Sequence, residues 1–254
     1  MMCIQNKETF KRMLLWSGMI VSLLLAGCKD EPVDHAGRGL DYARGGEYDK
    51  AISEFTKAIE ANPTSAESYY NRGLTYYYKG DNDRAISDYN KAIEINGRYA
   101  EAYDNRGNIY ADKGEFDLAI ADFSKALEIH PRFDRAYYNR GVVYNHKGQY
   151  DPAIADFTKA IELNPSYAGA YCNRGLAYGR NGQFDEAVLD LSKAIEINPG
   201  MPEAYNNRAV VYYGQKEYDK AWEDVHKAQG LGFKVSDGLF KALSEAAAAA
   251  ATEK

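Results

Sequence analysis

Five asparagines stand 34 residues apart along the chain, and their chemistry suits the binding of a peptide. They are Asn71, Asn105, Asn139, Asn173 and Asn207. A carboxamide carries both a donor and an acceptor, so it can bond to a peptide group from the side. A row of them can follow an extended backbone without reading its sequence. The alternative is that each asparagine bonds only to its neighbours within the protein.

Aromatic and charged side chains accompany this row. The tyrosines that we expect to pack against apolar or proline-rich side chains of a partner are Tyr70, Tyr77, Tyr78, Tyr138 and Tyr213. Asp104 and Asp112 make one part of the row acidic, whereas Arg135, His146 and Arg180 make a later part basic. Such polarity can orient a bound peptide.

Residues for catalysis or metal binding do not converge in the sequence. The histidines, at positions 35, 130, 146 and 226, fall at different places in the 34-residue period, and none has metal-ligand spacing to a cysteine. The patterns GxxxxGK[ST], HExxH and GxSxG are missing. Acids that recur with the period are typical of structural positions. We therefore expect no catalytic residue, no metal and no cofactor, and a protein that is not an enzyme.

Charge and hydropathy exclude two further classes. The formal net charge of −6 argues against a general phosphate-binding surface, so we expect no nucleic acid partner. The mean hydropathy is −0.56, and only one long apolar run stands out, which excludes a polytopic membrane protein.

The elements that must position these residues are written six times in the sequence. The six units are residues 32–65, 66–99, 100–133, 134–167, 168–201 and 202–235. Tyr69, Gly73 and Tyr76 share one face of a first helix, and Ala85 and Tyr89 lie on the buried stripe of a second. Neither helix can bury its stripe alone, so neighbouring units must stack. The sequence predicts an all-α solenoid of six helix hairpins.

The order aromatic, Gly, Tyr, Ala, aromatic, Ala and Pro, kept with limited departures such as His35 for the first aromatic and Gly97 for the Pro, resembles the tetratricopeptide repeat. In the third unit it falls on Tyr103, Gly107, Tyr110, Ala119, Phe123, Ala126 and Pro131. The resemblance implies antiparallel helix pairs in a right-handed superhelix, with the first helices lining the concave face. Residues 236–254 follow as a capping helix, expected from Leu239 to about Ala251 with Ser236 or Asp237 as its N-cap, and an Ala-rich tail.

One departure from that family concerns stability. Each unit has Arg where the family usually has Leu, and an acid follows 16 residues later. We predict ion pairs within the hairpins, such as Arg106–Asp122 and Arg140–Asp156. The alternative is two solvated columns of charge.

The N-terminus has the pattern of an export signal. Lys11 and Arg12 precede an apolar stretch from Met13 to Leu25, which is shorter than the roughly 20 residues that span a bilayer. Leu25-Ala26-Gly27-Cys28 resembles the lipobox of bacterial lipoproteins. The resemblance implies a signal peptide over residues 1–27, acylation of Cys28 with diacylglycerol and palmitate, and a lipidated tether at 28–31. The alternative is an ordinary signal peptide with a chance cysteine.

These features predict a non-catalytic scaffold or adaptor for protein–protein interaction. We expect a lipid anchor to hold it to a membrane of the bacterial cell envelope, on the periplasmic side, where it binds peptide segments of envelope proteins. The first alternative is a structural envelope protein that self-associates through Cys172 or by end-to-end stacking. The second is an enzyme with an unrecognised site.

Overall fold

The computed structural model describes residues 33–252, and the side chains of residues 33–246. The predicted signal peptide and tether, including Cys28, lie outside the described residues. Within them the chain forms α-helices and no strand. It divides into two compact units, Met1–Lys113 and Gly114–Lys254, called here the N-terminal and C-terminal units. The predicted all-α solenoid of hairpins is confirmed, whereas the right-handed superhelix stays a prediction.

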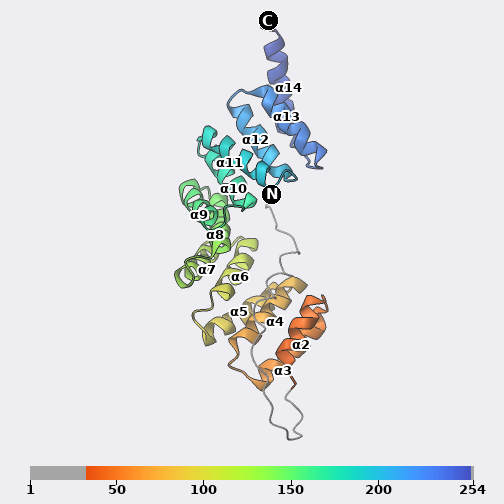
Figure 1. The fold of residues 1–254 in the computed structure, drawn as a ribbon, viewed down its shortest axis with the longest axis vertical. Coiled ribbons are helices and arrows are strands. Elements are labelled where there is room, and N and C mark those ends of the chain that lie inside the picture. Colours follow the sequence, from red (N-terminus) through yellow and green to blue (C-terminus); the bar gives the residue numbers. More distant parts are fainter. Residues whose placement is uncertain (1–32, 253–254) are drawn as a thin grey trace. The chain divides into compact units, whose positions relative to one another are not determined.

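Five helices of the N-terminal unit lie within the described residues, and they are coloured orange to yellow-green in Figure 1. They are α2 (His35–Arg44), α3 (Tyr48–Ala61), α4 (Ala66–Lys79), α5 (Asn82–Ile95) and α6 (Ala100–Asp112). Each helix packs on the next, and the first helices α2 and α4 also touch each other. This is the contact that stacks one hairpin on its neighbour.

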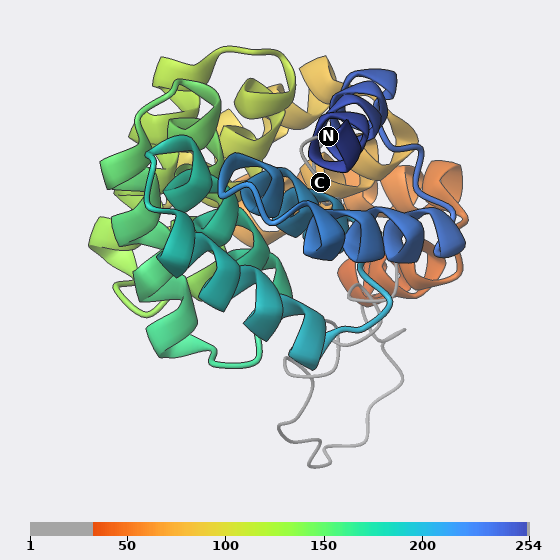
Figure 2. The same cartoon turned by 90° about the horizontal axis from the view of Figure 1, so that it is seen from above.

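The C-terminal unit continues the same pattern, as the green to blue helices of Figure 2 show. Its helices are α7 (Phe116–Ile129), α8 (Asp134–His146), α9 (Tyr150–Leu163), α10 (Ala168–Arg180), α11 (Phe184–Ile197), α12 (Pro202–Gly214), α13 (Tyr218–Gly230) and α14 (Asp237–Thr252). Here α10 contacts both α8 and α12, so first helices again stack on first helices.

Small residues bring the two helices of a hairpin together, as the sequence predicts. A Cβ placed on Gly73 would lie 3.0 Å from the ring of Tyr89, and one on Gly175 would lie 2.8 Å from Leu191 Cγ. Ala85 faces this contact from the second helix and is fully buried. The glycine column is therefore required by close packing.

The turn within a hairpin needs a left-handed residue. Gly80 adopts φ +86°, and Lys216 replaces the glycine in the sixth hairpin at φ +64°. A non-glycine residue in this region is strained. The sixth hairpin keeps the turn conformation nonetheless.

The predicted ion pair between Arg140 and Asp156 is confirmed. Arg140 Nε and Nη2 each donate to the carboxylate of Asp156 at 2.8 Å, and Nη1 donates to Ser124 Oγ of the preceding repeat at 2.9 Å. These bonds raise the pKa of the Arg140 guanidinium. The same arrangement holds in the pairs Arg72–Asp88, Arg174–Asp190 and Arg208–Asp224. Each arginine therefore joins its own hairpin and ties it to the hairpin before it.

The first hairpin departs from this scheme. Glu54 pairs with His35 at 2.7 Å and with Lys57 at 2.6 Å, and Arg38 is exposed and makes no ion pair among the described residues. Among the described residues no hydroxyl contacts Arg38 in the way that Thr56 Oγ1 contacts Arg72 in the second hairpin. Arg106 and Asp122 belong to different units, so that predicted pair stays a prediction.

The last helix closes the array. It begins at Asp237, two residues before the expected Leu239, because Ser236 Oγ accepts the Leu239 amide at 3.3 Å. Leu243 is fully buried against the sixth hairpin. The helix thus covers the apolar end of the last repeat, as an end cap must.

Candidate peptide-binding face

The asparagine column lies on the first helices α4, α6, α8, α10 and α12, and all five side chains are half-buried. Asn105 Nδ2 donates to the hydroxyl of Tyr70 at 2.9 Å, and Asn173 Nδ2 donates to that of Tyr138 at 2.9 Å. Asn207 makes a longer contact of 3.7 Å with Cys172 Sγ. In each case the acceptor stands 35 residues earlier, directly before the asparagine of the preceding repeat.

These bonds fit the expectation that the asparagines bond to their neighbours, and they also hold the carboxamides in place. The Oδ1 atoms of Asn173 and Asn207 make no hydrogen bond among the described residues. Such atoms can still accept an N–H group from a ligand. The sequence does carry a signal for this arrangement, because a polar residue stands directly before the asparagine of the preceding repeat. That this residue bonds to the asparagine of the next repeat depends on how the helices stack.

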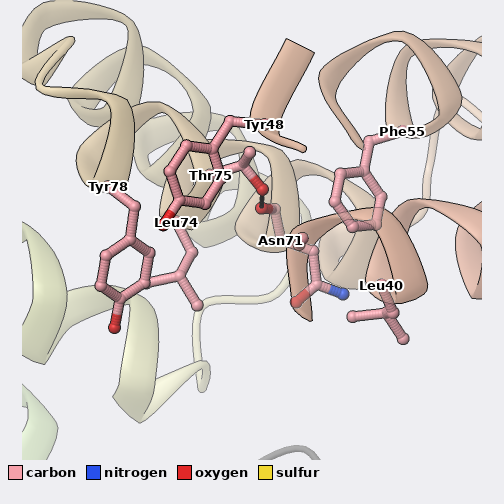
Figure 3. A pocket seen from close by; sticks show the side chains of 8 residues that line it. Leu40, Tyr48, Phe55, Asn71, Leu74, Thr75 and Tyr78 are labelled. Carbon is pink, nitrogen blue, oxygen red and sulfur yellow. Dashed lines mark hydrogen bonds between the residues drawn. The ribbon is translucent and has the colours of Figure 1, made fainter. Parts of the chain in front are cut away.

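Asn71 is the exception in the column. The residue 35 positions before it is Ala36, which has no side-chain acceptor. Its carboxamide instead borders a small hollow between α2 and α4, and Figure 3 shows it beside Leu40, Leu74 and Thr75. The hollow has a volume of about 10 Å³, room for about one water-sized group. It is much smaller than a small-molecule pocket of roughly 300–1,000 Å³.

Two of the predicted contact tyrosines belong mainly to the packing between repeats. The ring of Tyr138 is only 8% exposed and stacks on Tyr167 with centroids 4.7 Å apart. Tyr70 is half-buried and lies 4.8 Å from the ring of Tyr99. The expectation that Tyr138 packs against a partner is corrected by this burial, because the protein itself covers the ring.

Of the remaining predicted tyrosines Tyr78 is exposed, whereas Tyr77 and Tyr213 are half-buried like Tyr70. Tyr78 is 38% exposed and meets Tyr77 edge-on at 5.7 Å. It also stacks on Tyr48 at 6.3 Å, and both rings border the hollow of Figure 3. Tyr213 is half-buried against Tyr218 at 5.8 Å. Tyr77, Tyr78 and Tyr213 therefore keep their predicted place as candidate contacts.

The charged residues predicted to orient a peptide differ in how well they can contact a ligand. Asp104 is fully buried, so it does not form the acidic surface that the sequence suggested. Asp112 lies at the surface, and partial desolvation raises the pKa of its carboxyl. Burial, together with the positive charge of Arg180, lowers the pKa of His146. The basic residues His146 and Arg180 thus lie near each other on neighbouring first helices.

Other candidate chemistry finds little support among the described residues. Cys172 is 1% exposed, so its thiol is not available for a disulfide between chains. Over residues 33–252 no three side chains of the metal-ligating types gather into a group that could hold a metal ion. No helix in this part of the chain has the length and apolar character that crossing a membrane requires.

Comparisons with known proteins agree with this architecture. Family models for the tetratricopeptide repeat match residues 66–99, 134–167 and 168–201, and a related model for the same repeat matches 39–80 and 107–148. No curated protein sequence gives a significant match.

Among solved structures, YrrB, described as a TPR protein with an unusual peptide-binding site, is 30% identical with a TM-score of 0.64. The match covers 75% of this chain and 96% of YrrB. MamA is 32% identical with a TM-score of 0.60, over 63% of this chain and 94% of MamA. PilW, described as a type IV pilus biogenesis factor, is 21% identical with a TM-score of 0.70, over 82% and 96% of the two chains, and supports the fold alone.

The hairpins and their stacked first helices define a helical-repeat interaction protein. The chain belongs to the tetratricopeptide repeat family. Its relatives are generally non-catalytic scaffolds that bind protein or peptide partners.

Proposed function

We propose that the chain is a lipid-anchored, non-catalytic adaptor of the bacterial envelope that binds extended peptide segments along its asparagine column. The observation that carries the proposal is the fixed orientation of these side chains. The bonds Asn105–Tyr70 and Asn173–Tyr138, both 2.9 Å long, hold the amides before any partner arrives. Because these side chains are already ordered in the free protein, less conformational entropy is lost when a peptide binds.

The energetics favour several weak bonds over one strong one. A net hydrogen bond contributes about 0.5–1.5 kcal/mol, so the column supplies only a few kcal/mol. Specificity must come from the side chains beside it. The accessible rings of Tyr77, Tyr78 and Tyr213 are the groups in position to add apolar contact.

The binding proposal is tested by affinity capture from detergent-solubilised envelope, followed by mass spectrometry. Asn105→Ala combined with Asn173→Ala should lose the captured partners, and the loss of two hydrogen bonds of about 0.5–1.5 kcal/mol each should lower the melting temperature only modestly, so the variant stays folded during capture. Asn82→Ala is the matched control, because Asn82 opens α5 and stands outside the column. Equal capture by the double variant and the control would exclude the column as the binding site.

The anchor rests on the sequence Leu25-Ala26-Gly27-Cys28. If Cys28 is acylated, Lys29 to Pro32 extend at most about 14 Å, so the first repeat stands close to the lipid head groups. Cys28→Ser should abolish labelling by radioactive palmitate and release the chain from the membrane fraction, whereas Cys3→Ser should change neither. Unaltered labelling of the Cys28 variant would refute the anchor without touching the binding proposal.

A further inference from the structure

Asp112 is the last residue of α6, where a negative charge is unfavourable. The carbonyl end of a helix carries partial negative charge, so acids there are unfavourable and bases are favoured. The corresponding positions of the other first helices hold Arg44, Tyr78, His146, Arg180 and Gly214, and three of these are basic. The carboxylate of Asp112 is therefore not there to stabilise its own helix.

No cation of the described residues compensates this carboxylate. Asp112 makes no ion pair or hydrogen bond there, and its pKa is raised by desolvation with no charged neighbour to lower it. The adjacent Lys113 donates instead to Asp83 at 2.8 Å, and Lys79 pairs with Asp49. An exposed and partly desolvated carboxylate without a counter-ion favours a cation from outside the chain.

The register of the two first helices α4 and α6 relates Asp112 to Tyr77. Asn105 of α6 bonds to Tyr70 of α4, and these first helices run in the same direction (Figure 1). Asp112 lies seven positions after Asn105, and Tyr77 lies seven positions after Tyr70, which is about two helical turns in each case. Equal steps along two parallel helices keep the alignment, so Asp112 holds the register position opposite Tyr77.

Aromatic rings cluster at this end of α4. Tyr77 meets Tyr78 at 5.7 Å, and Tyr78 stacks on Tyr48 at 6.3 Å. Figure 3 shows the rings of Tyr48 and Tyr78 beside Leu74. A long aliphatic side chain of a ligand would make apolar contacts with these three side chains. Aromatic faces attract cations at exposed sites, and they do so more strongly once water is excluded.

We propose that Asp112, Tyr77 and Tyr78 form a subsite for one lysine or arginine side chain of the bound peptide. The carboxylate neutralises the charged group, and the rings pack against its methylene stem and its charge. This inference rests on the proposed function, because the asparagine column must hold the backbone that presents the side chain.

The test is a selection of unstructured 12-residue peptides from a randomised display library against the full mature chain. The natural protein should enrich peptides with Lys or Arg at one fixed position. Asp112→Asn should still select peptides but lose that enrichment, with binding of a selected lysine peptide about three- to tenfold weaker. Asp83→Asn is the matched control and should keep the basic preference, because Asp83 serves the bond to Lys113.

The substitutions also separate binding from folding. Asp112→Asn removes an unfavourable helix-end charge, so it should not lower the melting temperature. Tyr77→Phe keeps the ring face and should retain the lysine peptide, whereas Tyr77→Leu should weaken it. Peptides enriched without any basic position, or an Asp112→Asn variant that binds the lysine peptide unchanged, would overturn the subsite. A natural protein that enriches no peptide at all would overturn the proposed function itself.

Discussion

The pair Arg140–Asp156 allows a quantitative test of how the hairpins are held together. The side chain of Asp156 is 7% exposed and that of Arg140 is 20% exposed. Breaking a buried pair by removing one partner costs about 3–5 kcal/mol, because a charge is left uncompensated. Water reaches part of Arg140, so we take the lower end. Arg140→Leu should lower the free energy of unfolding by about 3 kcal/mol.

The double variant Arg140→Leu with Asp156→Leu should behave differently. Replacing both partners of a buried pair by apolar residues is often neutral or stabilising, so we expect a loss of less than about 1 kcal/mol. The coupling energy of the double-mutant cycle is then at least about 2 kcal/mol. Loss of the bond to Ser124, worth about 0.5–1.5 kcal/mol, is common to both arginine variants and cancels.

The assay is urea unfolding followed by circular dichroism, with the slope m compared among variants. Repeat arrays can unfold in parts, so only variants with the same m allow the free energies to be compared. Arg38→Leu is the matched control, because Arg38 forms no ion pair within the described part of the chain, and it should cost little. Additive losses from Arg140→Leu and Asp156→Leu would refute the coupling.

Three further results are expected. A hydrogen bond from His35 lowers the pKa of the Glu54 carboxyl from 4.5 to about 2, so the contribution of Glu54 to stability is complete above pH 4.5 and is lost as the pH falls towards 2. The difference in melting temperature between the natural protein and the Glu54→Gln variant should therefore shrink over that interval. A difference that stays constant with pH would contradict the assignment. Gly175→Ala should destabilise by about 1–3 kcal/mol in urea, while Gly230→Ala, with no neighbouring atom within 4 Å, should not. The thiol of Cys172 should react with a thiol reagent only after unfolding, and rapid reaction of the native chain would disprove its burial.

Much of the fold follows from local pattern. The recurrence of Gly73 and Ala85 every 34 residues predicts hairpins, because small residues at these positions permit two helices to pack closely. The structure confirms the hairpins. The pairing of Arg140 with Asp156 was predictable for the same reason, since both lie within one hairpin. The first hairpin departs from the prediction because His35 and Lys57 pair with Glu54 in place of Arg38.

The candidate site was less predictable than the fold. The sequence placed Asn105 and Asn173 in one column but left open whether they bond to the protein or to a ligand. It treated Tyr138 and Asp104 as surface groups, and both are buried. Their exposure depends on the neighbouring repeat that covers them, which the pattern within one repeat does not describe.

The sequence by itself determined the helix hairpin, its period and the column in which the asparagines stand, because these depend on spacing within one repeat. Only the tertiary structure decided what each column member contacts. Successive first helices stack so that an asparagine meets the side chain 35 residues earlier, one position away from its own counterpart in the repeat. That offset arises from the packing of one hairpin on the next, and it separates Asn71, for which the residue 35 positions earlier is Ala36, from Asn105 and Asn173, for which it is Tyr70 and Tyr138.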